Sequence, residues 1–207
     1  MLICILCEFQ GVSQSSKSTL YFPNAFIYEV GRGNEKSELW IYHNPQKGQY
    51  LYVPNDDMVK AVLGSPNGIY KTYAQTEDGK KVIFTTKISK VLEKSKPNNR
   101  LKSINSNRRI NASQGQILSK GFTLSYLKTN EIDTLFLSTQ IKGNANVLYG
   151  FSMLDGDDKL PNSFALLGEV PNSQFLTEYV SKYSSVKLIA YESNPYQFDV
   201  KGYKSIK

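Results

Sequence analysis

Two short motifs near the amino terminus combine residue types that can perform chemistry. Cys4 and Cys7 are separated by two residues, the spacing of a redox pair or of half a metal site. They are the only cysteines and His43 is the only histidine, so no second pair of ligands completes a zinc site. A redox pair should follow a strand and open a helix, whereas this pair lies within an apolar run. We interpret both cysteines as apolar residues of an export segment or a buried strand, and expect no metal or cofactor.

The second motif has nearly the spacing of a phosphate-binding loop. Gly11 precedes Lys17 and Ser18 at the required distance, but Ser16 stands where the pattern needs a glycine. Such a loop must also open a helix whose amides hold phosphate. The following residues, 19–22, instead have the aromatic pattern of a strand. A nucleotide-binding function is therefore disfavoured.

The same stretch suits a secretory signal. Residues 1–9 are apolar except for Glu8, and the small residues Gly11 and Ser13 suit a peptidase that cuts before Gln14. The apolar run is short and has no basic residue before it, and a buried first strand is the alternative. We expect residues 1–13 to be the remnant of an export signal. This predicts a mature protein in the bacterial periplasm or on the cell surface.

Other catalytic patterns are incomplete. There is no Gly-x-Ser-x-Gly elbow, and His43 is expected to be a partly exposed strand or turn residue. The acidic run at 155–158 has Lys159 and Leu166 where a calcium loop needs oxygen ligands, so an acidic turn is the better interpretation. We therefore predict that the protein is not an enzyme.

The net charge of +7 is concentrated in one segment. Between Lys80 and Arg109 there are ten basic residues and one acid, and the rest of the chain is close to neutral. A polyanion such as nucleic acid or anionic lipid is one possible partner. Nucleic acid is the less favoured of the two, because no aromatic side chain between Phe84 and Phe122 is available for base stacking. The candidate anion contacts are Lys94, Lys96, Arg100, Lys102, Arg108 and Arg109.

The elements that must position these residues are mostly strands. The chain contains fourteen tyrosines, and all eight prolines stand beside an asparagine, a pairing typical of turns. Segments between these turns alternate with period two. The predicted strands cover 39–43, 50–53, 68–76, 81–88, 122–126, 135–137, 147–151 and 187–192, with 196–206 closing the sheet. Short helices are predicted at 56–63 and 173–184.

These elements predict an α+β protein, mostly antiparallel β-sheet with two short helices. Two similar lobes, 19–93 and 116–207, are expected on either side of a basic linker or long loop at 94–115. The order strand, Val-Pro-Asn, helix, strand occurs at 50–75 and again at 166–192. It is either an internal duplication or two independent uses of Pro-Asn to start a helix.

A hairpin of 39–53 carries the most promising binding residues. Trp40 and Tyr42 are expected to oppose Tyr50 and Tyr52, giving a four-ring surface that either packs in the core or faces a ligand. We favour an exported, non-enzymatic binding or assembly protein of the bacterial envelope, holding a protein partner or an apolar or glycan ligand on this aromatic sheet face. The alternative is polyanion binding through residues 94–109.

The same hairpin resembles a known family. Residues 38–45 (Glu-Leu-Trp-Ile-Tyr-His-Asn-Pro), followed by Gly-Gln-Tyr-Leu-Tyr at 48–52, resemble the strand-turn-strand of LolA-like periplasmic lipoprotein carriers. Asn44 stands where that pattern usually has aspartate. The resemblance covers about fifteen residues and implies a curved antiparallel sheet enclosing an apolar cavity.

Overall fold

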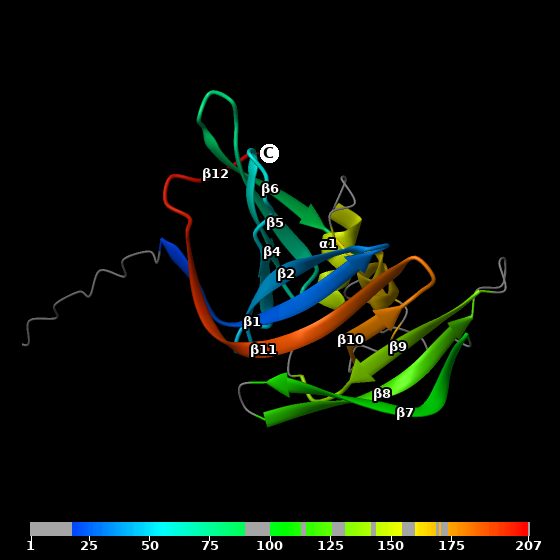
Figure 1. The fold of residues 1–207 in the computed structure, drawn as a ribbon. Helices are drawn as coiled ribbons and strands as arrows, with labels where there is room; N and C mark the ends of the chain where they lie inside the picture. The colour runs from blue at the N-terminus through cyan, green and yellow to red at the C-terminus, as the bar shows by residue number, and fades with distance from the viewer. Residues whose placement is uncertain are drawn as a thin grey trace, which may run out of the picture.

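The computed structural model describes residues 18–89, 100–112, 115–125, 131–141, 144–154, 160–168, 170 and 174–206. Strands dominate this part of the chain (Figure 1). They are β1 (Thr19–Arg32), β2 (Glu35–Asn44), β3 (Gln49–Tyr52), β4 (Val59–Gly64), β5 (Ile69–Gln75), β6 (Lys81–Lys87), β7 (Leu101–Ala112), β8 (Gly115–Ser125), β9 (Ile132–Ser138), β10 (Phe175–Val180), β11 (Ser184–Asp199) and β12 (Lys204–Ser205). The helices are α1 (Asn146–Leu154) and the 3₁₀-helix η2 (Asn162–Gly168).

All of these strands belong to one 12-stranded sheet, in the order β10-β9-β8-β7-β11-β1-β2-β3-β4-β5-β6-β12. The pairings are antiparallel except β11–β7 and β12–β6. The expected α+β class with a mostly antiparallel sheet is therefore confirmed. The predicted strands are confirmed as well, apart from 147–151 and 196–206; Tyr126, at the end of the strand predicted at 122–126, lies outside the described residues. Residues 196–199 continue β11, the strand predicted at 187–192, and only Lys204–Ser205 form a separate strand, β12.

The longest pairing joins the first described strand to the last long one. β1 pairs with β11 along almost its whole length, from Thr19 opposite Asp199 to Arg32 opposite Ser184. The other edge of β11 pairs with β10 and, at Tyr191, with β7. Strands β7 to β11 thus close into a ring of five, while β2 to β6 continue the sheet beyond β1. Both proposed lobes contribute to one sheet, and their boundaries stay a prediction.

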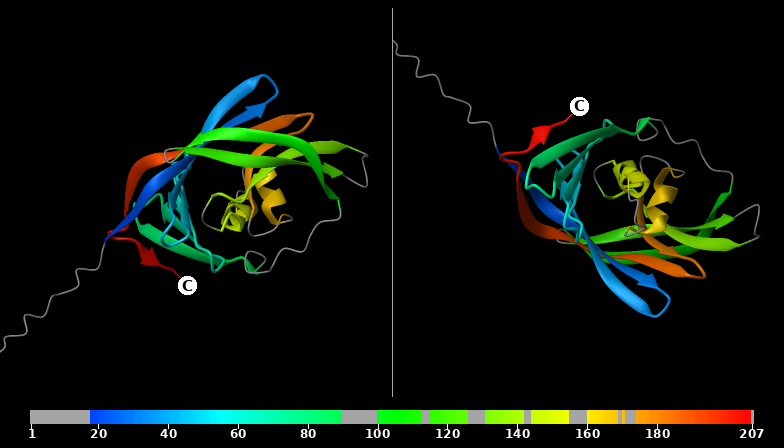
Figure 2. Two further views of the ribbon diagram at one scale, coloured as in Figure 1. Left: turned by 90° about the horizontal axis from the view of Figure 1, so that it is seen from below. Right: turned by 90° about the horizontal axis from the view of Figure 1, so that it is seen from above.

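The two helices lie inside the curve of the sheet (Figure 2). Their apolar side chains form the main core with the sheet's inner face, including Tyr28, Tyr70, Phe151 and Phe164, which are at most 1% exposed. Tyr70 donates a hydrogen bond to the Val147 carbonyl at 2.7 Å, which ties α1 to β5. The helices therefore fill the concave side and hold the sheet in its curved shape.

The prediction of a strand at 147–151 is wrong, because this stretch is helix α1. Val147, Tyr149 and Phe151 alternate, but Val147, Leu148 and Phe151 also have helical spacing, and all are buried. Asn144 Oδ1 accepts the Asn146 N–H at 3.1 Å, which caps the helix start. The apolar pattern is ambiguous, and the core around Tyr70 selects the helix.

The helix predicted at 56–63 is also wrong. Asp56 Oδ1 accepts the N–H groups of Met58 and Val59 at 2.7 and 2.8 Å, as a helix cap would, but the chain then enters β4. Ala61 and Leu63 are buried in a second, smaller core cluster, which they form with Phe22, Leu51 and Tyr73. Asp56 therefore caps a turn and not a helix, because the backbone N–H and C=O groups of β4 are hydrogen-bonded to β3 and β5.

The helix predicted at 173–184 is wrong for a different reason. Residues 175–180 form β10, which lies between β9 and β11 and is buried on both faces. A strand covered on both faces has no polar alternation, so Phe175, Leu176 and Tyr179 imitate a helical stripe. With neither predicted helix present, the repeated order of elements that suggested a duplication disappears.

The basic linker requires a correction within the described residues. Of the predicted 94–115 segment, residues 101–112 are strand β7, paired with β8. Its many polar residues fit a strand with one face open to solvent, since only Ile110 is buried. Lys94 and Lys96 lie outside the described residues.

Candidate binding groove

The four-ring surface predicted for the β2–β3 hairpin does not form. The register places His43 opposite Tyr50 and Ile41 opposite Tyr52, one residue away from the expected pairing. Because side chains alternate between faces, Tyr50 and Tyr52 lie on the inner face and Trp40 and Tyr42 on the outer face. Tyr50 is 0% exposed and belongs to the core. The four-residue turn at 45–48 sets this register.

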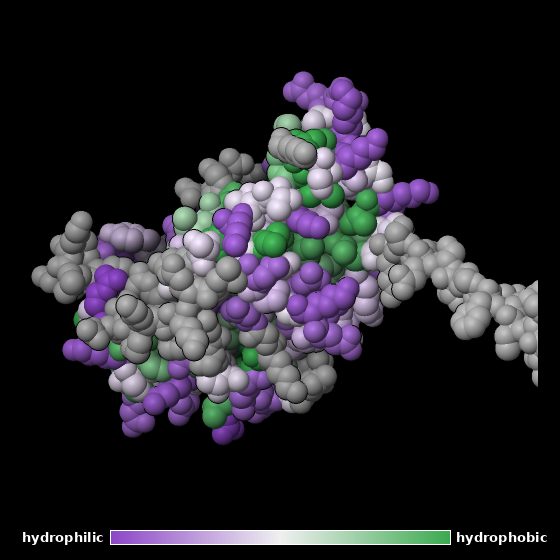
Figure 3. Space-filling view, turned by 180° about the vertical axis from the view of Figure 1, so that it is seen from behind, coloured by the Kyte–Doolittle hydropathy of each residue, from purple (hydrophilic) through white to green (hydrophobic). Residues whose placement is uncertain are grey.

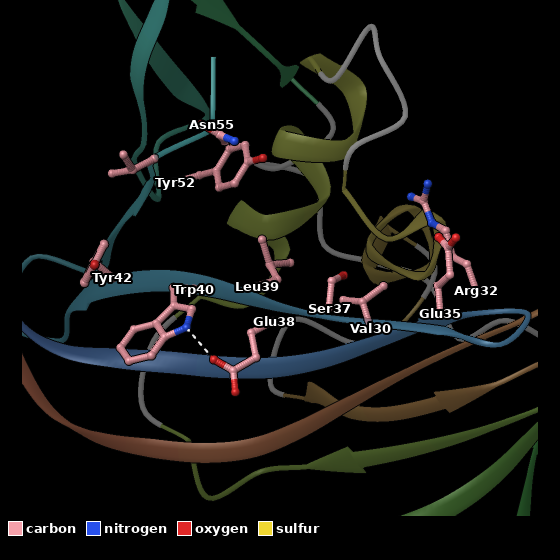
Figure 4. A pocket seen from close by; sticks show the side chains of 11 residues that line it. Val30, Arg32, Glu35, Ser37, Glu38, Leu39, Trp40, Tyr42, Tyr52 and Asn55 are labelled. Atoms are coloured by element: carbon pink, nitrogen blue, oxygen red, sulfur yellow. Dashed lines mark hydrogen bonds between the residues drawn. The ribbon is translucent and has the colours of Figure 1, made fainter. Parts of the chain in front are cut away.

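Three of the four aromatic residues nevertheless line one cavity of about 500 Å³. Figure 4 shows it at the edge of β2, between that strand and the chain leaving β3. Trp40 and Tyr42 approach it from the outer face of the sheet, and Tyr52 approaches from the inner side near α1. We call this cavity the β2 groove. Its lining is Val30, Arg32, Glu35, Ser37, Glu38, Leu39, Trp40, Tyr42, Tyr52, Val53 and Asn55.

The groove exists because β3 is shorter than β2. β3 pairs only with residues 41–44, whereas β2 continues back to Glu35 beside β1. Val53 and Pro54 follow β3, and proline would stand opposite Leu39 if the register continued. Proline has no N–H and rarely continues a ladder. Pro54 is therefore the sequence signal that could have located this free edge.

The backbone of β2 presents polar groups to the groove. β1 and β2 are joined by a two-residue turn, with Gly33 at φ 60°, and Arg32 stands opposite Glu35. The closing pair of such a hairpin exchanges both hydrogen bonds, and every second residue repeats this. The N–H and C=O groups of Lys36, Glu38 and Trp40 therefore face away from β1. Among the described residues, no strand lies opposite Lys36 or Glu38, whereas Trp40 lies opposite Val53, the residue that follows β3.

Two aromatic side chains of the groove, Trp40 and Tyr42, are each held in place by a neighbouring side chain. Tyr42 stacks on Tyr196 of β11 with ring centroids 4.1 Å apart, and partial burial with the nearby Tyr196 raises the pKa of the Tyr42 hydroxyl. Trp40 Nε1 donates to Glu38 Oε2 at 3.1 Å. Both side chains are half-buried. A ligand would thus meet an aromatic surface that is already ordered.

The outer rim of the groove carries excess negative charge. Glu38 stands directly opposite Glu29 on β1, a pairing of like charges. Lys36 Nζ forms an ion pair with Glu29 at 3.0 Å. Glu38 has no basic partner among the described residues, whereas Glu35 lies on the inner face directly opposite Arg32. The rim is therefore suited to a positively charged group.

His43 lies beneath this region and is completely buried, so the expectation of a partly exposed histidine is wrong. Its ring stacks on Tyr50 with centroids 4.4 Å apart, and Nδ1 is 3.1 Å from the Tyr191 hydroxyl. Neither His43 Nε2 nor Tyr50 Oη has a hydrogen-bond partner in the described part of the chain. Burial lowers the pKa of His43 to about 4, so the imidazole is neutral at pH 7.

The predicted anion contacts do not converge where the structure describes them. Arg108 forms an ion pair with Glu178 at 3.3 Å and lies over the Phe136 ring. Arg109 is the next residue of β7, so its side chain points to the opposite face. Lys102 is exposed and lies beyond a register shift in β7–β8 pairing. Arg100, just before β7, has interaction partners of its own.

The rest of the described residues provides no second candidate site with comparable features. They contain no group of three His, Cys, Asp or Glu side chains placed to hold a metal ion. No helix among them is long and apolar enough to cross a membrane. Apolar side chains also reach the surface on the back of the molecule, below the hydrophilic tip of the β5–β6 hairpin (Figure 3). The cysteine pair, the loop at 11–17 and the acidic run at 155–158 lie outside the described residues.

Comparisons with known proteins give structural likeness only. The sequence matches no model of a known protein family, and no curated protein matches it. One solved structure with a similar backbone is that of PNGF-II in the C2 space group. The two share 10% sequence identity with a TM-score of 0.47, over 88% of this chain. The chain spans only 30% of the length of that protein.

Proposed function

We propose that this chain is a non-enzymatic binding or assembly protein of the bacterial envelope, which holds a ligand or protein partner in the β2 groove. The observation that carries the proposal is the cavity of about 500 Å³ walled by Trp40, Tyr42 and Tyr52. Ligand sites are concave, mostly aromatic or apolar, and carry a few polar groups that orient the ligand. The β2 groove offers both kinds of group, because three aromatic and three aliphatic residues line it together with five polar or charged side chains, Glu38 among them.

The proposal can be tested with the chain's only tryptophan, which is Trp40. We expect its emission to shift when a ligand fills the groove, because the indole then exchanges water for ligand contacts. The probes are one alternating valine–lysine heptapeptide, chitohexaose and lauric acid, which represent a peptide, a glycan and an acyl chain. Each is titrated against the full chain, and affinities are confirmed by calorimetry.

Tyr52→Ala should weaken binding of the responding probe about tenfold, since it removes one wall of the groove. Phe84→Ala is the matched control, because Phe84 is an aromatic residue on β6 that is 46% exposed and outside the groove. It should leave the affinity unchanged. If no probe shifts the emission or releases heat, or if both variants behave alike, the proposed site is wrong.

Export is proposed from the apolar residues at the amino terminus. Expression from the native gene with its upstream region, followed by cell fractionation and mass spectrometry, should yield an envelope protein that starts at Gln14. An intact cytoplasmic chain that starts at Met1 would contradict export. It would leave the groove proposal standing, but with an intracellular partner.

A further inference from the structure

We infer that the occupant of the β2 groove is an extended peptide with basic side chains, which adds a strand to the free edge of β2. This inference rests on the proposed function and names the ligand class of the same site. It is drawn from three observations that a glycan or an acyl chain does not explain: the unpaired backbone of β2, the distribution of the lining over both faces of the sheet, and the charge of the rim.

The first observation is the row of backbone groups. Lys36, Glu38 and Trp40 direct N–H and C=O groups away from β1 at every second residue, over a length of about 13 Å, and Glu38 and Trp40 line the groove. Only another extended chain offers donors and acceptors with the same repeat. β1 has no register shift opposite this stretch, and no proline or bulge interrupts β2 from 35 to 40. Of the devices with which proteins block strand addition, this stretch has charged side chains but neither a proline nor a bulge.

The second observation is that the groove surrounds the edge instead of covering one face. Val30, Ser37 and Leu39 lie on the inner face, whereas Glu38 and Trp40 lie on the outer face (Figure 4). An added strand places alternate side chains above and below the sheet. It would contact Leu39 and Val30 with one set and Glu38 and Trp40 with the other. The lining therefore matches a strand with apolar residues on one face and polar residues on the other.

The third observation, the charge of the rim, indicates which charge the polar side chains of the added strand should carry. Glu38 stands opposite Glu29, and Lys36 already forms an ion pair with Glu29. A lysine or arginine of the added strand would neutralise Glu38 and remain within reach of the Trp40 ring. Because Glu38 is exposed, this pair should contribute more to register and specificity than to affinity. The peptide that fits best alternates apolar and basic residues.

The decisive experiment changes the backbone of the peptide and leaves its side chains intact. The acetylated heptapeptide Val-Lys-Val-Lys-Val-Lys-Val is compared with two forms, N-methylated at all valines or at all lysines. In an added strand only one set of N–H groups faces β2. We expect one methylated form to lose at least tenfold in affinity and the other to bind nearly as well as the parent peptide. Trp40 emission and calorimetry are the readouts.

Variants of Glu38 test the protein side of the same contact. Glu38→Gln removes the charge and keeps the N–H group, so binding should weaken two- to fivefold. Glu38→Pro also removes the N–H that faces the groove, and binding should weaken at least tenfold more. Thermal unfolding shows whether Glu38→Pro remains folded, and the N-methylated peptides decide the question if it does not.

The outcomes separate the two proposals. Equal binding of both methylated peptides, or no binding of the parent peptide, overturns strand addition. If chitohexaose or lauric acid then shifts Trp40 emission and Tyr52→Ala abolishes the shift, the groove is a ligand site of another class. If none of the probes binds, the proposed function fails together with this inference.

Discussion

Replacing Gly150 with alanine is expected to destabilise the protein by about 3 kcal/mol. A Cβ atom at this position would overlap Cζ and Oη of Tyr70, whose ring lies directly against the α1 backbone. Tyr70 is fully buried and bonded to the Val147 carbonyl, so it cannot move aside without breaking that bond. In a free helix alanine is favoured over glycine by about 1 kcal/mol, so a large loss must come from packing. Urea unfolding of purified protein measures the effect.

A double mutant tests the cause. Tyr70→Leu removes the atoms that the new methyl group would meet, so Gly150→Ala should cost much less in a Tyr70→Leu background. Ser152→Ala serves as the control in the same helix; it loses the hydrogen bond from Ser152 Oγ to the Tyr149 carbonyl and should cost about 1 kcal/mol. Strict additivity of Gly150→Ala and Tyr70→Leu would show that the contact between β5 and α1 is not the source of the loss.

The protein should lose about 3 kcal/mol of stability through His43 alone as the pH falls from about 6.5 to 4. Burial lowers the pKa of His43 from 6.5 to about 4 in the folded state. Between these values the unfolded chain binds a proton that the folded chain does not, so stability falls with pH. Asn24 Nδ2 donates to the Tyr191 hydroxyl at 3.0 Å, which leaves that hydroxyl proton for His43 Nδ1. The ring proton is then on Nε2, which has no acceptor among the described residues.

Carboxylates also titrate in this range, so the contribution of His43 is obtained by difference. His43→Phe keeps an aromatic ring beside Phe26 and Tyr50 but cannot be protonated. Its unfolding free energy should fall less steeply between pH 6.5 and 4 than that of the wild type. Because the chain has one histidine, a single imidazole resonance reports the folded pKa directly by NMR. A titration midpoint near 6.5, with parallel stability profiles, would contradict the prediction.

The wrong expectations have identifiable physical causes. Val147–Phe151 alternates as a strand would, and only contact with Tyr70 and Gly64 of the sheet shows that the stretch is a helix. Residues 175–180 have a helical stripe because both faces of β10 are covered. In each case one apolar pattern suits two structures, and the long-range partner decides between them. Periodicity did identify β5 and β6, whose segments alternate between two flanking turns.

In the candidate site too, the residue types were evident from the sequence, whereas their arrangement depends on long-range pairing. Trp40, Tyr42 and Tyr52 were identified from their residue types, and they do line a cavity. The surface predicted for them was wrong because the turn at 45–48 shifts the β2–β3 register by one residue. Val30 and Arg32 join the site only through the pairing of β1 with β2. No local pattern marked those two residues.

By itself, the sequence determined that this chain forms a mostly antiparallel sheet with breaks between strands at Asn44-Pro45, Pro54-Asn55 and Pro66-Asn67, because alternation and turn chemistry act over a few residues. Pro23-Asn24 and Asn194-Pro195 instead lie within β1 and β11, where their pairing shifts register. It also located the aromatic residues of β2 and β3. The tertiary structure alone decided that β1 pairs with β11, that His43 is buried, and that β2 extends beyond β3 to leave an open edge. These features depend on register and on contacts between residues far apart in the chain, which local patterns do not specify.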